Sequence, residues 1–206
     1  MSSHPNPQVS NFGFTSASLR PDLVGIMAEK LLELGSWDKT KVAILETNAL
    51  QCSSTSSCLR LERELRQRLQ TLTEMQLQLL STTTSDGRTA LSWLASVKRY
   101  KFFYSLATEL LTAKLDLNDT VLRRSDYEFF VAEHAIENLE FQTLTETTQV
   151  KIRQVTMRML REVGILLKGC ELGLLIRPIV PPEVEDAIRA DDPRWLSAFL
   201  IPQALI

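Results

Sequence analysis

The chain has 206 residues, of which 44% are hydrophobic and 23% are charged, and its formal net charge is −2. This length and apolar content suffice for a buried core, and no apolar run approaches the ~20 residues that a membrane-spanning helix needs. The net negative charge excludes a global attraction to nucleic acid, so any such binding must come from a local basic surface.

Residues 1–11, MSSHPNPQVSN, have neither the cationic start nor the apolar stretch of a secretory signal. We therefore expect a flexible N-terminal arm and a cytoplasmic protein. Residues 12–120 show helical periodicity with few glycines and predict a helical bundle. The expected helices span residues 19–34, 38–49, 55–80 and 88–114. The first is expected to have Ser18 as its cap and Gly35 as its stop, and the last to kink near 98–101.

A polar loop is expected at 81–87, and residues 115–124 look like a connection, which places a domain boundary near residue 120. In the unit 121–206, Ser125 is expected to cap a helix, a turn covers 138–144, and a second helix covers 146–163. Two apolar runs, 165–167 and 172–176, predict one short β-hairpin. Prolines at 181–182 and at 193 begin two further short helices.

Helix, turn, helix and hairpin in this order are typical of a winged helix-turn-helix domain, whose second helix enters the DNA major groove. Many α-rich domains without a nucleic-acid function share the order. The predicted class is therefore mainly α, with a helical bundle followed by a winged-helix-like C-terminal unit.

The helix 146–163 separates its charges from its apolar residues at 100° per residue. Its apolar stripe consists of Ile152, Val155, Met159 and Val163, and its polar stripe of Lys151, Gln154, Arg158 and Arg161. Arg153 lies to the side, at a different angle. Residues 149–168 hold five basic residues, the last of them Lys168 in the hairpin turn, but only one acid, Glu162. Solvated faces normally mix both signs.

Two interpretations of the polar stripe remain open. Arg and Lys suit phosphates, Arg and Gln can also bond base edges, and Thr147 and Thr148 at the helix start can join backbone N–H groups around a phosphate. Alternatively, acids from elsewhere in the fold neutralise the stripe. The candidates for that role are Glu183, Glu185 and Asp186.

The helix 55–80 carries as many basic residues as the helix 146–163, all of them arginines, but it also has acids four residues away from three of them. This spacing predicts the local pairs Arg60–Glu64, Glu62–Arg66 and Glu64–Arg68. We therefore predict a solvated face, whose edge of Arg60, Arg63 and Gln67 is a candidate second phosphate surface.

Catalytic patterns are few. Asp116, Asp119 and Asp126 are expected to be solvated in and beside the connection, and His134 to be a packed, hydrogen-bonded residue rather than an acid or base. Cys52, Cys58 and Cys170 contain no CxxC pair and are typical of reduced thiols without a catalytic role. With His4 and His134 as its only histidines, the sequence predicts no zinc cluster. Glycine-rich phosphate loops, GxSxG and HExxH are absent from the sequence. We expect no enzyme, cofactor, metal or small-molecule substrate.

Several segments resemble the BrxA family of the BREX bacteriophage-exclusion systems, a family once labelled as inner-membrane. The resemblance runs in matching order from about Phe12 to Pro202. Its segments are FTSASL (14–19), ETNALQCSSTSSCLRLERELRQRLQTL (46–72), SDYEFF (125–130), TLTETTQVKIRQVTMRMLREVGIL (143–166) and IRPIVPPEV (176–184).

The resemblance implies a helical, non-enzymatic component of a phage-defence system, with a core similar to the NusB antitermination fold and a helix-turn-helix-like part that binds double-stranded DNA. The DNA-facing candidates it implies are Lys151, Arg153, Arg158 and Arg161. From the residues alone we add Gln154 as a base contact and Lys168 as a contact to an adjacent phosphate. The alternative is an adaptor that docks another BREX protein through the same basic stripe.

Overall fold

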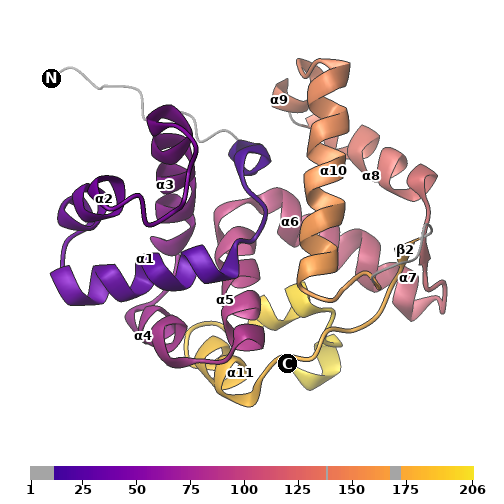
Figure 1. Ribbon diagram of the computed structural model, residues 1–206. Helices are drawn as coiled ribbons and strands as arrows, with labels where there is room; N and C mark the ends of the chain where they lie inside the picture. Colours follow the sequence, from indigo (N-terminus) through magenta and orange to yellow (C-terminus); the bar gives the residue numbers. More distant parts are fainter. Residues whose placement is uncertain (1–11, 138, 168–172) are drawn as a thin grey trace, which may run out of the picture.

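The computed structural model describes residues 12–137, 139–167 and 173–206, and the fold is mainly helical, as predicted (Figure 1). The first helices are η1 (Gly13–Ser16), α1 (Pro21–Leu34), α2 (Trp37–Glu46), α3 (Thr55–Leu69), α4 (Glu74–Thr82) and α5 (Ser85–Arg99). They are followed by α6 (Lys101–Ser105), the π-helical turn η2 (Leu106–Leu111), α7 (Thr112–Asp116), α8 (Arg124–Glu137) and α9 (Leu139–Gln142). The last helices are α10 (Glu146–Glu162), α11 (Pro182–Arg189), η3 (Pro193–Phe199) and η4 (Gln203–Leu205).

One two-stranded antiparallel sheet pairs β1 (Val121–Leu122) with β2 (Gly173–Leu174). Leu166 and Leu175 form a further antiparallel bridge, which agrees with the predicted pairing of 165–167 and 172–176. The expected hairpin turn lies in residues 168–172, outside the described residues. Gly173 suits its place, because a side chain there would press against the Leu166 side chain and the Leu122 carbonyl oxygen at 3.0 and 3.1 Å.

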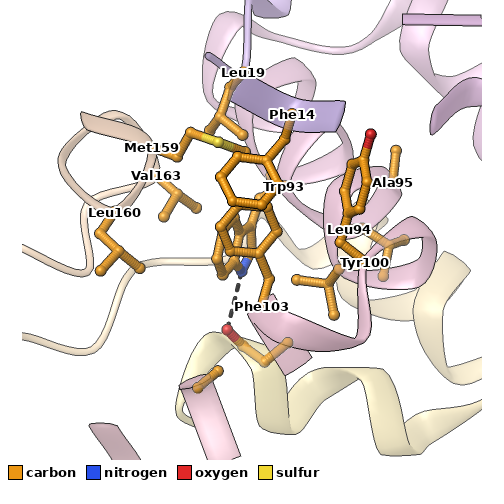
Figure 2. Packing of buried hydrophobic residues seen from close by; sticks show 14 of the residues in the cluster. Phe14, Leu19, Trp93, Leu94, Ala95, Tyr100, Phe103, Met159, Leu160 and Val163 are labelled. Atoms are coloured by element: carbon orange, nitrogen blue, oxygen red, sulfur yellow. Dashed lines mark hydrogen bonds between the residues drawn. The ribbon is translucent and has the colours of Figure 1, made fainter. Parts of the chain in front are cut away.

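A buried aromatic group forms the centre of the core (Figure 2). Phe14 of η1 packs on Phe103 with ring centroids 4.5 Å apart, and Trp93 of α5 packs on Phe103 at 5.3 Å. The indole N–H of Trp93 donates to the Ala198 carbonyl oxygen at 3.0 Å, which ties η3 to α5. Met159 of α10 belongs to the same buried cluster and lies near Phe14 in Figure 2. The apolar side of the basic helix is therefore anchored in the main core.

A buried ion pair fastens the N-terminal segment to α3. The Arg68 guanidinium donates from Nε to Glu64 at 2.7 Å and from its two Nη atoms to the carbonyl oxygens of Ser18 and Ala17 at 2.8 and 2.9 Å. The Tyr100 hydroxyl donates to both oxygens of Glu64 at 2.7 and 2.8 Å. Burial, followed by the charge of Glu64, raises the pKa of the Tyr100 phenol above its usual value.

This network corrects the predicted solvated face of α3. The pairs Glu62–Arg66 and Glu64–Arg68 form as predicted, at 2.9 and 2.7 Å, but Glu62, Glu64 and Arg68 are buried. The predicted pair Arg60–Glu64 is absent among the described residues, because Glu64 already receives Arg68 and Tyr100. A spacing of four residues on a helix predicts an ion pair but does not predict whether the pair is buried.

The helix predicted over 55–80 is two helices. Thr73 caps α4 in a capping box, in which its hydroxyl accepts from the Gln76 N–H and the Gln76 side chain accepts from the Thr73 N–H. The predicted loop 81–87 shrinks to two residues, because Thr84 accepts from the Gly87 N–H and begins α5 at Ser85. Both boundaries follow from side-chain capping.

Other helix limits were predicted with mixed success. The kink near 98–101 is confirmed at Tyr100, which lies in extended conformation between α5 and α6. Gly35 ends α1 in left-handed conformation, as predicted, whereas the cap is Arg20 and not Ser18. The expected turn 138–144 contains the short helix α9, and α8 begins at Arg124, before Ser125. Pro182 and Pro193 begin α11 and η3, as predicted.

Replacing Arg68 tests how much the buried network contributes to the free energy of unfolding. Arg68→Ala leaves Glu64 buried with only Tyr100 as its donor, and we expect it to lower the free energy of unfolding by about 3–5 kcal/mol in denaturant titrations. Tyr100→Phe, which removes one donor, should cost about 1–3 kcal/mol. Arg63→Ala, exposed on the same helix, is the control and should change stability by about 0.5 kcal/mol or less. If Arg68→Ala and Arg63→Ala lowered the free energy of unfolding equally, the stabilising role of the buried network would be contradicted.

Candidate nucleic-acid interface

The helix α10 has the ends that the sequence predicts. The Thr145 hydroxyl accepts from the Thr148 N–H at 3.3 Å and lies 2.9 Å from the Thr148 hydroxyl, so these two threonines hold the first turn. Thr147 is exposed. At the other end Gly164 has a φ of 82°, which favours glycine and ends the helix.

The two faces of α10 differ as the periodicity predicts. Its inner side buries Ile152, Thr156, Met159 and Leu160, with Val163 following at the C-cap. Lys151, Gln154 and Arg158 are exposed, and Arg161 is half-buried. Because the inner side is fixed in the core, the outer side presents these four residues on a rigid support. We call Lys151, Gln154, Arg158 and Arg161 the basic face.

The three cations of the basic face have no hydrogen bond or ion pair with any residue of the described ranges. The acids suggested as neutralising partners are not bonded to them. Glu183 accepts from the Thr83 hydroxyl at 3.1 Å, and Glu185 pairs with Arg189 at 2.7 Å. Asp186 is exposed and forms no ion pair within the described chain. The interpretation in which these acids pair with the stripe is therefore wrong.

Of the two acids of α10, Glu146 lies in the first turn and Glu162 turns inward. Glu162 accepts from the Leu19 N–H at 2.9 Å and so joins the end of α10 to the segment before α1. Glu162 also lines the edge of an open depression of about 760 Å³ on the outer side of the helix. The other residues that line this depression are Arg153, Gln154, Met157, Arg158 and Arg161.

Arg153 differs from the basic face, as its helical angle predicts. Its Nη1 donates to Glu128 of α8 at 3.1 Å, and the Nε of Arg124 donates to the same oxygen at 2.6 Å. Arg124 and Glu128 are not among the site residues predicted from the sequence. Their spacing of four residues predicts the pair within α8, but the contact with Arg153 joins residues 25 apart in the chain. Lys168 lies outside the described residues.

The candidate second surface on α3 is partly occupied. Arg60 and Arg63 are exposed and form no ion pair within the described part of the chain. Gln67 accepts from the Arg99 guanidinium at 3.1 Å, so its side chain is already engaged. In Figure 1, α3 and α10 stand on opposite sides of the short helix η1, and both pack against it. Two free cations remain on α3.

The residues considered for catalysis have structural partners. His134 is half-buried, contacts the Phe130 carbonyl oxygen at 3.0 Å through Nδ1, and lies 3.2 Å from Glu109 through Nε2. This agrees with the packed, hydrogen-bonded role predicted for it. Burial raises the pKa of the Cys58 thiol to about 11, which keeps it protonated and unreactive at neutral pH. Among the residues with a described position, no three of His, Cys, Asp and Glu gather into a metal site.

Two of the three aspartates near the connection are not simply solvated, contrary to the prediction. The Lys114 ammonium contacts Asp119 at 2.6 Å and Asp126 at 2.7 Å, and Arg123 contacts Asp119 at 2.7 Å. Hydrogen bonds from Lys114 and Arg123 hold the pKa of Asp119 well below its usual range. Partial burial opposes ionisation of Asp126, but the hydrogen bonds from Lys114 and the Arg123 N–H outweigh it and lower its pKa. Asp116 alone is exposed.

The fold and the site together define a small, mainly helical protein that presents a cationic helix face without partners in the described part of the chain. A family model described as BrxA matches residues 11–192. The chain therefore belongs to the BrxA family, which confirms the resemblance seen in the sequence and indicates a component of a BREX defence system.

A solved structure shows the same fold. It is described as the crystal structure of an uncharacterized protein from Magnetospirillum magneticum, and it matches with a TM-score of 0.75 and 19% sequence identity. The match covers 94% of this chain and 98% of that one. No protein with a curated description matches the sequence. Across residues 12–137, 139–167 and 173–206, no helix combines the length and apolar character needed to span a membrane.

The aspartate cluster predicts a dependence of stability on acid. The pKa of Asp119 is lower in the folded state than in the unfolded state. Its ionised carboxylate therefore contributes fully to stability above the unfolded pKa of about 3.9, and this contribution is lost as pH falls through the folded-state pKa. We expect Asp119→Asn to lower Tm at pH 7 and the difference from wild type to shrink steadily below about pH 4. Asp116→Asn, at an exposed position, is the control in the same thermal scans. If the Tm difference between Asp119→Asn and wild type stays constant down to pH 2, the ionised aspartate does not stabilise the fold in this way.

Proposed function

We propose that the protein is a non-enzymatic, double-stranded DNA-binding accessory component of a BREX phage-defence system and that it binds through α10. The observation that carries the proposal is the basic face itself. Lys151, Arg158 and Arg161 are free of partners in the described chain, whereas the opposite side of the same helix is buried. DNA supplies the regularly spaced anions that such a rigid cationic stripe lacks.

The charge distribution supports binding to phosphates more than reading of bases. The three cations cover one helix face of a chain whose net charge is −2, so the attraction is local and its strength depends on salt. Gln154 lies among them and is the expected base contact, since Gln can bond adenine in the major groove. We expect modest affinity with little sequence preference. Thr147 and Thr148, at the start of α10, are proposed to lie beside a phosphate.

The alternative function is an adaptor that uses the basic face to dock an acidic surface of another BREX protein. The two functions differ in their response to duplex DNA and to salt. DNA binding falls with a log-log slope of about −0.9 for each phosphate neutralised, which counts the contacts. Co-purification of a BREX partner that survives salt, is lost with the basic-face variants and is unaffected by duplex DNA would instead support the adaptor.

Reversing two charges of the basic face tests DNA binding. We expect Lys151→Glu/Arg158→Glu to abolish measurable binding of a fluorescent duplex in titrations from 50 to 300 mM salt, because two phosphate contacts become repulsive. The matched control is Lys39→Glu/Lys41→Glu, which changes the net charge equally. These two residues are on α2, which lies away from α10 in Figure 1. The proposal fails if both variants bind like wild type, or if wild type does not bind at 50 mM salt.

The second surface on α3 gives a separate prediction. If the duplex reaches from α10 across to α3, Arg60→Glu/Arg63→Glu should weaken binding and reduce the salt slope by up to about 1.8, the value for two phosphates. A short duplex that covers α10 alone is the control, since it should bind the variant and wild type equally. An unchanged slope with long duplexes would remove Arg60 and Arg63 from the binding surface.

A further inference from the structure

Three charged side chains meet where α8 lies against α10. Arg124, in the first turn of α8, and Arg153, on α10, both donate to one oxygen, Oε1 of Glu128, at 2.6 and 3.1 Å. These residues lie on the rim of a cavity of about 340 Å³ between the two helices, whose wall includes Tyr127, Val131 and Phe141. Two guanidinium groups from different helices therefore converge on a single carboxylate and leave an excess of one positive charge.

The Arg124–Glu128 pair of this junction is exposed enough to exchange, whereas the side chain of Arg153 is 25% exposed. The side chain of Arg124 is 72% exposed and that of Glu128 is 50% exposed. Exposed pairs of this kind contribute little, about 0–1 kcal/mol, to stability because water solvates both charges. A DNA backbone phosphate has two anionic oxygens, as a carboxylate has, and can likewise bind guanidinium groups through paired hydrogen bonds.

Arg153 links this junction to the basic face. It lines the cavity beside Glu128 and also the open depression that contains Arg158 and Arg161. The two hollows therefore share a wall. A phosphate that contacts Arg158 and Arg161 in this depression lies beside Arg153, which is already bonded to Glu128.

We propose that Glu128 occupies the place of a DNA phosphate. In the free protein its carboxylate holds Arg124 and Arg153 together, and in the complex a backbone phosphate of duplex DNA competes with it for both guanidinium groups. Glu128 thus limits the affinity of the DNA-binding surface, and Arg124 extends that surface from α10 onto α8. This inference rests on the proposed DNA binding by α10.

Removing the carboxylate should strengthen binding. Glu128→Gln leaves both arginines available from the start, so the phosphate contact for which Glu128 competes in wild type is made in full. We therefore expect higher affinity and a log-log salt slope that is steeper by up to about 0.9. The matched control is Glu146→Gln, which removes a carboxylate that lines the same cavity without bonding either arginine. We expect the control to leave the slope unchanged, since it alters the local charge but adds no contact.

A second set of variants separates release of the arginines from a general effect of charge. In the background Arg124→Gln/Arg153→Gln, the further change Glu128→Gln should give no more affinity than Glu146→Gln does. The inference is overturned if the gain persists without the two arginines, or if Glu128→Gln and Glu146→Gln give equal gains and equal slopes in the otherwise unaltered chain. Thermal unfolding of each variant ensures that folded proteins are compared.

The outcomes distinguish the two proposals. If wild type binds duplex through Lys151 and Arg158 but Glu128→Gln behaves like Glu146→Gln, only the role of Glu128 is wrong. If wild type and Glu128→Gln both fail to bind duplex at 50 mM salt, DNA binding itself is wrong and the role of Glu128 fails with it.

Discussion

The buried pair of Arg68 and Glu64 is the interaction on which the rest of the structure depends. A single guanidinium holds two successive carbonyl oxygens, of Ala17 and Ser18, and its carboxylate partner also receives the Tyr100 hydroxyl. A buried charge is tolerated only when its hydrogen-bonding capacity is filled, and here backbone and side chains fill it together. The segment before α1 is thereby fixed against α3 and α5. Since the next residue, Leu19, donates its N–H to Glu162, the same segment also fixes the end of α10.

The position of α10 follows from these contacts and determines what it presents to solvent. With Met159 and Leu160 in the core and Glu162 bonded inward, rotation of the helix about its axis would expose apolar side chains and break a hydrogen bond. The cations are consequently held outward. Their exposure results from the packing of the other side and not from any partner of their own.

The sequence predicted α10 well because every signal for it is local. Thr145, Gly164 and the spacing of the apolar residues act within one turn of the residues that they affect. The capping box of Thr73 and Gln76 is also local, and its Thr-x-x-Gln spacing could have revealed the break between α3 and α4. The burial of Arg68 could not be predicted from local signals, because a solvated Glu64–Arg68 pair has the same spacing as a buried one. The contact of Glu128 with Arg153 and the pairing of β1 with β2 likewise join residues far apart in the chain.

A chain with more acids than bases can present a cationic surface only if its acids are engaged elsewhere. Glu64 and Glu62 are buried with arginines of their own helix, Asp119 and Asp126 surround Lys114, and Glu185 holds Arg189. Near α10, Glu162 accepts from the backbone N–H of Leu19, and among the acids with a described position only Glu128 bonds a cation of that helix, Arg153. The net charge of −2 therefore says little about the potential over α10, because the Coulomb interaction of screened charges decays within about 8–10 Å. The electrostatic potential that a phosphate experiences at this surface is therefore set by the few charges within that distance. Among these charges, Glu128 is the carboxylate that already bonds two arginines.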